Sequence, residues 1–543
     1  ALSGAGADSV NIVNNDVRGY MDNVSLQASE ATTDLLIDAY SDSTIGSLTG
    51  AVAAAISGGK GAVSGAIGVS LARNFIGYEN AADTVRNAGV RAYVNNSSLS
   101  GIHDLIIDAS VKDRVRTESF SGSVALAVGI GAGLAGAGAE ATTKIGTVVD
   151  AHVQNTSITA LNDITITAKG DSKITDALAV GVAVAAGAGG LSVGVSIVDS
   201  NISNQINAYI QNTSGKSVTA DNNVTVRANQ TAANIENVEA VTASVAAGGL
   251  ALSGGGIDID SIVANEIYAY IEGPAGTLDT HTVNATGNII VEAKETVALD
   301  ADSTNVSVAI GAGLDLALGV SLLDIKSESI VSAKVQNSYL NAKNISVLAS
   351  TDTIISKNET AGVSASTGVA ASGSHAKSYL RSTVEAKTLA SKLKANQTAD
   401  KQGGAIVISA KGDYEASAAA YGGALGQIAI GAMVAGVYGG KGDDIYEIKA
   451  DLGDNTIVEA ANTVTVTANG TADFLPESIA AGGGVVAAAG AKSDLSTNIS
   501  TLASIGENVQ IPNSTEEQSS TRPASLNVSS TFDQDVDASA DSY

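Results

Sequence analysis

The sequence contains no cysteine and no tryptophan, and only 4 proline, 4 phenylalanine and 2 methionine residues among its 543. Without cysteine the chain has no disulfide framework, no thiolate nucleophile and no cysteine-based metal site. Aromatic residues make up 3% of the chain, which argues against the thick core of a mixed globular enzyme. Disorder is also disfavoured, because 44% of the residues are hydrophobic and only 16% are charged.

Positive charge is scarce, with 29 Lys and Arg against 56 Asp and Glu and a net charge of −27. Nucleic acids and anionic membranes bind basic patches, so we expect neither as a partner. The uncharged stretch from Ala177 to Val198 is rich in Gly, Val and Ala, which favours β structure over a membrane span. No signal peptide is visible at Ala1, and we expect an excerpt or processed form of a larger, secreted chain.

What the chain has in abundance is repetition. A short alternating phrase that ends in Ala recurs every 56 to 70 residues, with a period near 60. Its copies are Asp34–Ala39, Asp104–Ala109, Asp163–Ala168 and Asn223–Ala228, then copies that end at Ala293, Ala349, Ala410 and Ala468, and a degenerate copy that ends at Ser529. A second phrase precedes each copy, as in Ala92-Tyr93-Val94, and His152 takes the place of the tyrosine in the next repeat. A Gly-rich, Val/Ala-rich run fills the gap after the first phrase.

Within a repeat the apolar residues alternate with period 2, as expected for β-strands. Only one strong two-residue hairpin signal occurs, at Asn469-Gly470. We therefore predict an all-β, right-handed parallel β-solenoid (β-helix) of about nine repeats, occupying residues 1–543 as a single repetitive unit with a loop-like insertion at 512–523. At about 20 to 30 residues per coil, each repeat would form two or three coils, and the rod would be on the order of 90 to 130 Å long.

The Gly-rich runs present apolar or small residues on both faces, as in residues 123–132. A strand of this kind is normally buried on both faces. The cover comes either from a neighbouring layer of the same chain or from another copy, and the sequence leaves both open. The sequence shows no polar terminal unit, so we expect either that more chain lies outside this excerpt or that uncapped ends of different copies stack on one another.

The phrases from Ala208-Tyr209-Ile210 through Val224-Thr225-Val226 to Ala243-Ser244-Val245 resemble the repeats of very large bacterial surface proteins, the filamentous-haemagglutinin-like and leukotoxin-like filamentous adhesins. The resemblance extends over most of the chain. It implies a secreted β-solenoid on the bacterial cell surface that adheres or builds extracellular fibres. The family supplies no catalytic residues.

Catalytic motifs find little support. The four histidines (His103, His152, His281 and His375) lie in different repeats without metal-ligand spacing. The segment Gly190–Gly194 matches the nucleophile pattern around Ser192, but no helix pattern follows it. A solenoid polysaccharide lyase or hydrolase would need carboxylates clustered on one outer face, for which the acidic pairs Asp258/Asp260, Asp443/Asp444 and Asp533/Asp535 are the candidates.

One motif suggests a metal. Residues 439–447 fit the Gly-rich nonapeptide of calcium-binding β-rolls, in which Asp443 and Asp444 would offer carboxylate oxygens. No second nonapeptide follows to complete such a site. Apart from possible calcium, no cofactor is expected.

These observations predict a non-enzymatic, extracellular protein of the cell surface that self-associates into, or forms part of, an adhesive fibre. Its expected partners are other copies of itself and, for adhesion, surface glycans or host receptors. A monomeric adhesin stalk shares every residue-level feature and remains an alternative. A β-helix polysaccharide lyase or hydrolase is the alternative of another class.

Overall fold

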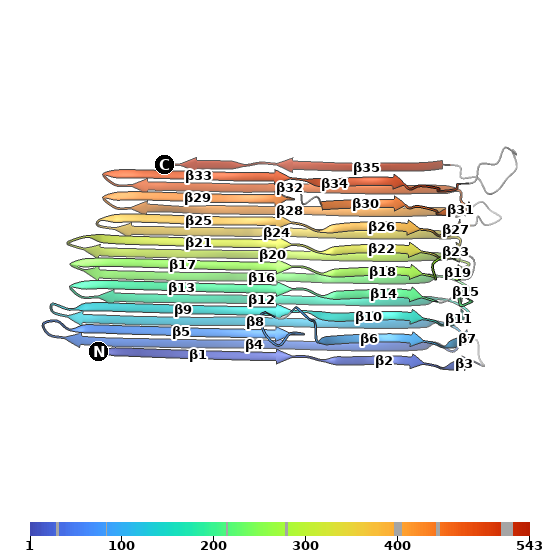
Figure 1. Cartoon of the computed structure of the whole chain (residues 1–543), viewed down its shortest axis with the longest axis horizontal. Coiled ribbons are helices and arrows are strands. Elements are labelled where there is room, and N and C mark those ends of the chain that lie inside the picture. Colours follow the sequence, from blue (N-terminus) through green and yellow to red (C-terminus); the bar gives the residue numbers. More distant parts are fainter. Residues whose placement is uncertain are drawn as a thin grey trace.

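The fold is a stack of parallel strands, seen in a computed structural model that describes residues 1–28, 32–82, 84–212, 215–276, 281–395, 404–440, 446–511 and 525–543. The strands form four parallel sheets, which we name A to D, and in coils 1 to 8 each sheet receives one strand from every turn of the chain, in sequence order (Figure 1). The described residues form strands, turns and bends but no helix. None of them therefore forms a helix suited to crossing a membrane. This arrangement confirms an all-β fold of the parallel β-solenoid class.

The strands of sheet A are β1 (Leu2–Val13), β5 (Val63–Ile76), β9 (Ala132–Ile145), β13 (Gly189–Ile202), β17 (Leu250–Val263), β21 (Asp315–Ser327), β25 (Val369–Leu380), β29 (Ile428–Gly439) and β33 (Val486–Thr497). Those of sheet B are β2 (Asp16–Asp22), β6 (Ala88–Asn95), β10 (Thr147–Gln154), β14 (Gln205–Gln211), β18 (Glu266–Glu272), β22 (Ile330–Gln336), β26 (Thr383–Leu389), β30 (Tyr446–Leu452) and β34 (Ile499–Ile505).

The strands of sheet C are short: β3 (Ser25–Gln27), β7 (Ser98–Ile102), β11 (Ser157–Ala160), β15 (Ser217–Ala220), β19 (Thr282–Ala285), β23 (Tyr339–Ala342), β27 (Lys392–Ala395) and β31 (Ile457–Ala460). Those of sheet D are long: β4 (Leu35–Gly58), β8 (Leu105–Val128), β12 (Ile164–Ala186), β16 (Val224–Gly248), β20 (Asn288–Gly311), β24 (Asn344–Ser366), β28 (Ala405–Leu425), β32 (Thr463–Gly483), β35 (Ser525–Val536) and β36 (Ser539–Ser542). One set of consecutive A, B, C and D strands is one coil, so that coil 1 is β1–β4 and coil 9 starts with β33.

Each coil uses a whole sequence repeat, so the expectation of two or three coils per repeat is wrong. Ile107 in β8 pairs with Ile166 in β12, one repeat later in the sequence. The cause is the length of the sheet D strands, since β4 spans 24 residues against about 5 to 6 in an ordinary strand. The stack is accordingly only on the order of 40 Å tall, and the longest axis of the molecule lies along the strands (Figure 1). The expected rod length was wrong for the same reason.

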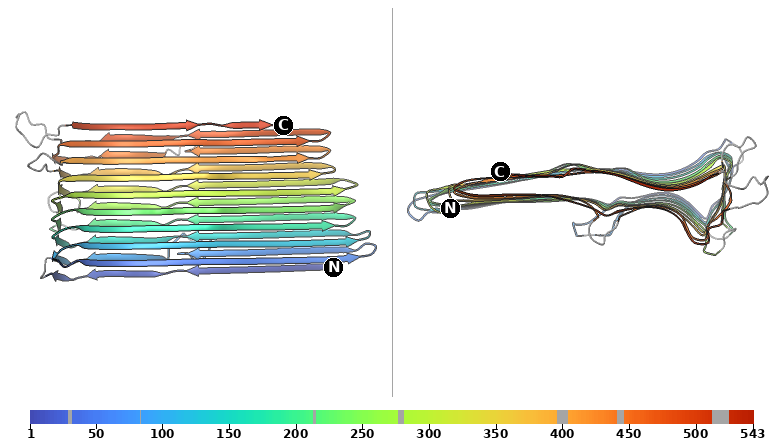
Figure 2. Two further views of the ribbon diagram at one scale, coloured as in Figure 1. Left: turned by 180° about the vertical axis from the view of Figure 1, so that it is seen from behind. Right: turned by 90° about the horizontal axis from the view of Figure 1, so that it is seen from above.

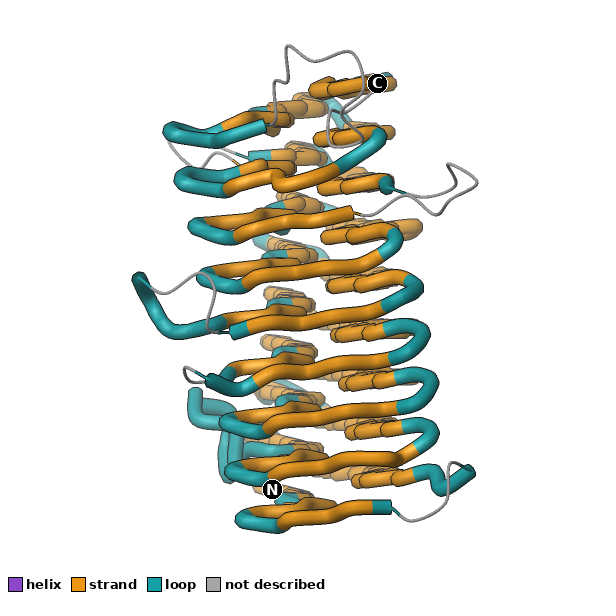
Figure 3. The backbone as a smooth tube through the Cα atoms, turned by 90° about the vertical axis from the view of Figure 1, so that its right-hand side faces the viewer, coloured by secondary structure: helices purple, strands orange, loops and turns teal. Residues whose placement is uncertain are grey.

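The coil has a wide part and a narrow part. Seen along the stack in Figure 2, the two long layers run close together on one side and diverge around the short sheet C on the other. Sheet A packs against the C-terminal half of sheet D, and we name this narrow part the blade. Sheets B and C and the N-terminal half of sheet D enclose the wide part. Figure 3 shows the coils lying one above another when viewed from the side that carries sheet C.

The wide part contains the main hydrophobic core, built by stacking like residues on like. The first repeated phrase begins each strand of sheet D, and its central apolar residue is buried in every coil from 1 to 8. These residues form one ladder: Ile37, Ile107, Ile166, Val226, Val291, Val347, Ile408 and Val466. The alternation predicted from the sequence is confirmed in this ladder, because the residues before and after a member point to the opposite face of the strand, as Thr225 and Arg227 do beside the buried Val226.

The core of the blade is made of small side chains. Alanines form separate buried clusters, such as the one that includes Ala53, Ala66 and Ala125. Buried hydroxyls join the two layers, and the Ser70 hydroxyl donates to Thr49 Oγ1 at 2.7 Å. Glycines allow the close approach, since a Cβ on Gly68 would lie 2.6 Å from the carbonyl oxygen of Gly122. The Gly-rich runs are therefore covered on their inner faces by the chain itself.

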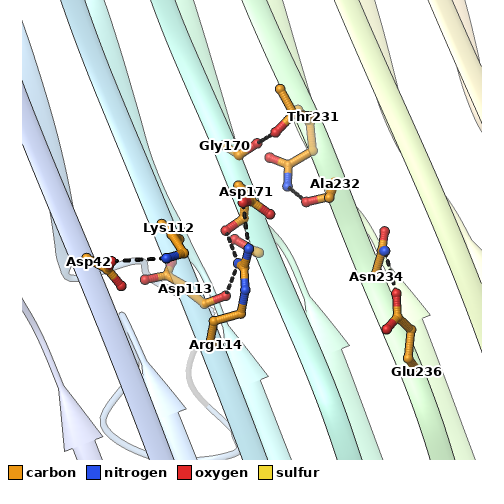
Figure 4. Close-up of polar contacts among 12 residues, drawn as sticks. Asp42, Lys112, Asp113, Arg114, Gly170, Asp171, Thr231, Ala232, Asn234 and Glu236 are labelled. Carbon is orange, nitrogen blue, oxygen red and sulfur yellow. Dashed lines mark hydrogen bonds and ion pairs between the residues drawn. The ribbon is translucent and has the colours of Figure 1, made fainter.

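Polar contacts tie coil to coil on the outer face of the wide part. The Lys112 ammonium donates to Asp42 Oδ2 at 3.3 Å, and the Arg114 guanidinium donates to Asp171 Oδ2 at 2.6 Å (Figure 4). Asn and Asp residues form a further ladder at the corner before sheet D, where Asp163 Oδ1 accepts a hydrogen bond from the backbone N–H of Asn223. The hairpin-like pair Asn469-Gly470 forms no turn, because it lies within β32.

An aromatic ladder runs along the outer face of sheet B. Adjacent rings in it are stacked with centroids 4.6 to 5.1 Å apart. Its members, in coil order, are Tyr20, Tyr93, His152, Tyr209 and Tyr270. His152 thus stands in the tyrosine position, as its place in the repeat predicted.

Removing a ring from the middle of this ladder is expected to destabilise the protein. Tyr209 stacks on His152 and on Tyr270, each at 4.6 Å. Tyr209→Ala should lower the free energy of unfolding by about 3 kcal/mol, as expected for losing a large half-buried side chain and two ring contacts. Tyr209→Phe keeps the ring and should change it by less than about 0.5 kcal/mol. Urea titrations followed by circular dichroism would measure both, and equal losses in the two variants would assign the effect to the hydroxyl instead of the stack.

Candidate interaction surfaces

The outer faces of the blade are apolar and exposed. On sheet A, Ile67, Val193, Leu318 and Ile430 have exposed fractions of 61%, 44%, 44% and 49%. The outer face of sheet D carries a second set of exposed large apolar side chains: Leu48, Val52, Ile56, Phe120, Val124, Val128, Val182, Val306, Ile310, Val363, Leu425 and Leu475. The sequence left open whether the chain itself or another copy covers the Gly-rich runs. The chain itself covers their inner faces, and no described residue covers their outer faces.

The outer face of sheet A changes character with every coil. Three neighbouring rows along the stack carry large apolar residues in even coils, except for Ala432 in coil 8, and small or polar residues in odd coils. From coil 1 to coil 9 the rows read Gly4, Ile67, Gly136, Val193, Gly254, Leu318, Ala371, Ile430, Ala488; Gly6, Val69, Gly138, Val195, Gly256, Val320, Gly373, Ala432, Gly490; and Asp8, Leu71, Glu140, Ile197, Asp258, Leu322, His375, Val434, Lys492. We name the even-coil residues of these rows the ridges and the odd-coil residues the grooves.

A hollow of about 580 Å³ lies on this face over coils 1 to 4. Its lining includes Ile67 and Val193 from two ridges, Gly136 from the groove between them, and Leu134. Since adjacent strands lie about 4.8 Å apart, successive ridges are separated by roughly 9.6 Å.

The groove glycines are not required by the fold of the chain. A Cβ on Gly138, Gly254, Gly256 or Gly490 would meet no atom within 4 Å. None of the four has a positive φ. Glycine inside a strand costs stability, and where it is kept it often marks the close approach of another backbone or a ligand.

Strand spacing does not force the alternation of ridges and grooves. In the core of the wide part, branched residues such as Ile107 and Ile166 stack directly on one another in adjacent coils. Large residues could therefore occupy every coil of sheet A. The two-coil period is a property of the outer surface alone.

A row of acidic residues borders the ridges on sheet A. Asp199, Asp260 and Asp324 follow one another in coils 4 to 6. Lys326 donates to Asp260 Oδ1 at 2.9 Å. Burial, together with the charge of Asp260, raises the pKa of Asp199 to about 6. The acidic pair Asp258/Asp260 that the sequence singled out belongs to this face.

A cleft of about 300 Å³ opens where the aromatic ladder ends. The ladder continues with Lys334 in place of a ring, so one face of Tyr270 is not stacked on another aromatic side chain. Tyr268 and Tyr270 line the cleft together with Lys334, Glu272 and Glu385. An aromatic face beside charged donors and acceptors is a suitable environment for a sugar ring.

A second hollow, of about 470 Å³, is acidic and lies on the outer face of sheet D in coils 6 to 9. Its carboxylates come from adjacent strands: Asp352, Asp413, Glu415, Asp473, Asp533 and Asp535. Thr471 Oγ1 donates to Asp413 Oδ1 at 2.8 Å, and Lys411 pairs with the same carboxylate. Asp533 and Asp535, one of the predicted acidic pairs, thus join a larger cluster, which the sequence did not predict because its members are about 60 residues apart.

Asp34, His103 and Asp104 also cluster, at the corner between sheets C and D. His103 Nδ1 lies 3.0 Å from Asp34 Oδ1 and 3.1 Å from Asp104 Oδ2. The hydrogen bond to Asp34 raises the pKa of His103. Asp104 also accepts the N–H of Asp163, so the group works as part of the corner ladder.

Two carboxyls and a histidine are among the titratable side chains buried in the wide part. Burial raises the pKa of Glu295 and of Asp113 to about 7 each, although Glu295 accepts hydrogen bonds from the Asn265 amide and two hydroxyls and Asp113 accepts one from the Thr147 hydroxyl. Burial lowers the pKa of His281 to about 4. These groups face the core and not a cleft, which makes them determinants of stability.

The remaining predicted residues are scattered. Ser192 is buried in the blade, where its hydroxyl donates to Ser253 at 3.4 Å, so it is not exposed as a nucleophile would be. His103, His152, His281 and His375 belong to different coils and do not meet. The calcium candidates Asp443 and Asp444, and the insertion at 512–523, lie outside the described residues.

Comparison with protein-family models, with curated proteins and with solved structures returns no match for this chain. The resemblance to large filamentous adhesins therefore depends on the repeated phrases alone.

Proposed function

We propose that this chain is a secreted, non-enzymatic protein of the bacterial cell surface that self-associates as part of an adhesive extracellular fibre. The observation that carries the proposal is the blade, which presents rows of exposed Val, Ile and Leu on both outer faces of a two-layered sheet. Large exposed apolar patches mark interaction surfaces, and two such faces on one molecule allow lateral assembly. The absence of cysteine and the net charge of −27 suit an extracellular structural protein.

The finer features of the fold belong to the same proposal. Right-handed winding is expected, because parallel strand crossovers are almost always right-handed. About nine repeats of near 60 residues would then give the fibre its stiffness. The resemblance to filamentous-haemagglutinin-like adhesins supports this architecture.

Adhesion would use a surface apart from the blade. The cleft beside Tyr270 supports glycan binding, since it combines an aromatic face with Lys334 and Glu272. A glycan screen with the wild type and with Tyr270→Ala tests this part: binding that survives the substitution would move the receptor site elsewhere.

The acidic hollow on sheet D favours a second candidate function. A polysaccharide lyase or hydrolase on a solenoid needs outer-face carboxylates in adjacent coils, and the cluster around Asp413 and Asp473 meets that condition. The same carboxylates suit calcium, which takes six to eight oxygen ligands. Turnover of acidic and neutral polysaccharides, measured by release of reducing ends or of unsaturated products, would establish the enzymatic alternative.

Electron microscopy and analytical ultracentrifugation of the purified chain test the main proposal. We expect side-by-side particles whose mass rises with concentration. Single particles at every concentration would contradict self-association and favour the monomeric stalk. Imaging with a calcium chelator separates the metal, because apolar contacts should survive chelation, whereas dissolution of the assemblies would make calcium a structural part.

A further inference from the structure

We propose that the outer face of sheet A binds the same face of a second copy in antiparallel stacking order, with the ridges of each copy seated in the grooves of the other. The inference rests on the self-association proposed above and specifies its face, partner and register. Four observations support it: the two-coil period of this face, its unneeded glycines, its charge pattern and its area.

The shape of the face selects the partner. A ridge of Val193, Val195 and Ile197 stands beside grooves floored by glycine, such as Gly138 and Gly256. Such a surface fits a second surface whose ridges and grooves have the same spacing and are shifted by one coil. The outer face of sheet D lacks this period, since its rows include runs such as Phe120, Val180 and Val241 in consecutive coils.

Symmetry then limits the arrangement. A two-fold axis parallel to the stack would place each coil opposite the same coil, so that ridges meet ridges and the grooves stay empty. A two-fold axis along the strands reverses the order of the coils and keeps each row opposite itself. Because ridges lie in even coils and grooves in odd coils, ridges then meet grooves only when each even-numbered coil faces an odd-numbered coil of the second copy.

Two such registers keep the most coils in contact, one with coil 1 facing coil 8 and one with coil 2 facing coil 9. The charges that each register brings together distinguish them. With coil 1 on coil 8, Arg73 would face Lys377 and Asp199 would face Asp260, which brings like charges together. With coil 2 on coil 9 and coil 4 on coil 7, Asp199 faces Lys377 of the second copy. In the described part of the chain, neither Asp199 nor Lys377 forms an ion pair.

The same register places other opposite charges together. Glu140 in coil 3 would lie opposite coil 8 of the second copy, between its His375 and Lys492. Arg73 in coil 2 would face Asp494 in coil 9. Glu140 thus meets the basic Lys492 at the other end of the third row, which a parallel arrangement would keep apart. His375 adds no such charge, because burial lowers its pKa.

Two symmetry-related like-charged pairs remain at the centre of this register, where Asp260 of each copy would face Asp324 of the other. Each copy also brings Lys326 to this place, and its ammonium lies 2.9 Å from Asp260 Oδ1. The charge of Lys326 also acts against the rise in the pKa of Asp324 that burial causes. The two lysines therefore offset the repulsion between the facing carboxylates.

The area is sufficient for a stable pair. Eight facing coils at about 4.8 Å and nine residues at about 3.3 Å give roughly 1,000 Å² per copy, above the ~800 Å² of a standard interface. Flatness favours the contact, because the coils almost superimpose when viewed along the stack in Figure 2.

Filling the grooves tests the proposal. Gly138→Val, Gly254→Val and Gly256→Val together add side chains where the isolated chain has open space. The monomer should keep its melting temperature, and the dissociation constant of the pair should rise at least about 100-fold, since each added side chain overpacks the interface. The matched control is Gly46→Val with Gly50→Val on sheet D, two glycines whose Cβ would also meet nothing. Sedimentation velocity over a wide range of concentration measures both.

A charge exchange tests the register. Lys377→Glu alone should weaken the pair about tenfold or more, and adding Asp199→Lys should restore it. These residues lie three coils apart in one chain, so restoration requires contact between copies.

The outcomes separate the two proposals. A monomeric wild type overturns self-association itself. Association that is broken by the sheet D control and not by the groove variants, or by Lys377→Glu without rescue, overturns only the proposed face or register.

Discussion

Gly255→Val is expected to destabilise the protein by about 3 kcal/mol, whereas Gly256→Val, one residue further along the same strand, should leave the stability of the monomer unchanged or raise it by up to about 1 kcal/mol. The side chain of residue 255 points into the blade, where a Cβ would lie 2.2 Å from Asn305 Oδ1 and 2.8 Å from Ser307 Oγ. The Asn305 amide donates to the carbonyl of Val320 at 2.9 Å, so moving the Asn305 side chain aside would break this hydrogen bond. Residue 256 points outward, and its Cβ would meet nothing within 4 Å.

Denaturation in urea at low protein concentration, followed by circular dichroism, measures both changes without a contribution from association. The matched design matters because the two variants share chemistry, strand and coil. Equal losses would show that the blade is not a closed two-layered structure at coil 5. A loss confined to Gly256→Val would reverse the assignment of inner and outer faces and remove the basis for the grooves.

The sequence predicted the parallel class of the fold because its signals are local. Alternation within phrases such as Asp163–Ala168 and the scarcity of proline and hairpin pairs favour stacked strands, and His152 aligned with the tyrosines through its repeat position. The length of the coil was missed for a physical reason. Gly, Ser and Asn normally mark turns, but in the blade they are core residues, because two sheets this close admit only small side chains. Small residues such as Gly122 and Ser123 accordingly lie inside β8 and not at a corner of the coil.

The candidate surfaces could be predicted only in part. Apolar residues on both faces of residues 123–132 indicated a strand that needs two covers, and the structure assigns one cover to the chain. The ridges and grooves were missed because successive repeats were compared at a period near 60, whereas Gly138, Val195 and Gly256 alternate over two coils. The acidic hollow around Asp413 joins residues from four coils, and no local spacing reports it. Asp443 and Asp444 formed a local motif and lie outside the described residues.

Glu295→Gln is expected to make the protein more stable at pH 8 by up to about 3 kcal/mol and to have little effect at pH 4. Burial raises the pKa of Glu295 from 4.5 to about 7. In the unfolded chain the carboxyl ionises near pH 4.5, while the folded chain holds the proton until about pH 7. Between these values the unfolded state binds fewer protons, so stability falls as pH rises, and the full loss is present above pH 7.

Glutamine preserves the hydrogen bonds that the glutamate makes. Oε1 accepts from the Asn265 amide at 2.9 Å and from the Ser329 hydroxyl at 2.7 Å, and an amide group in place of the second oxygen can donate to Thr351. The variant therefore removes a titration with little change in packing. Thermal melts of both proteins from pH 4 to pH 8 should give curves that diverge above about pH 4.5. Parallel curves would mean that Glu295 titrates alike in both states and that water reaches it.

His281 provides the opposite sign in the same experiment. Burial lowers its pKa from 6.5 to about 4, so its stabilising contribution is complete above pH 6.5 and is lost as the pH falls toward 4. Asp113, with a pKa raised to about 7, adds to the effect of Glu295. Two buried acids against one buried histidine predict greater stability at pH 5 than at pH 8. Asp113 lies in coil 2, whereas Glu295 and His281 both lie in coil 5. Because neighbouring coils unfold together in a stacked structure, comparing substitutions at the two coils would also show how far a local loss of stability spreads along the stack.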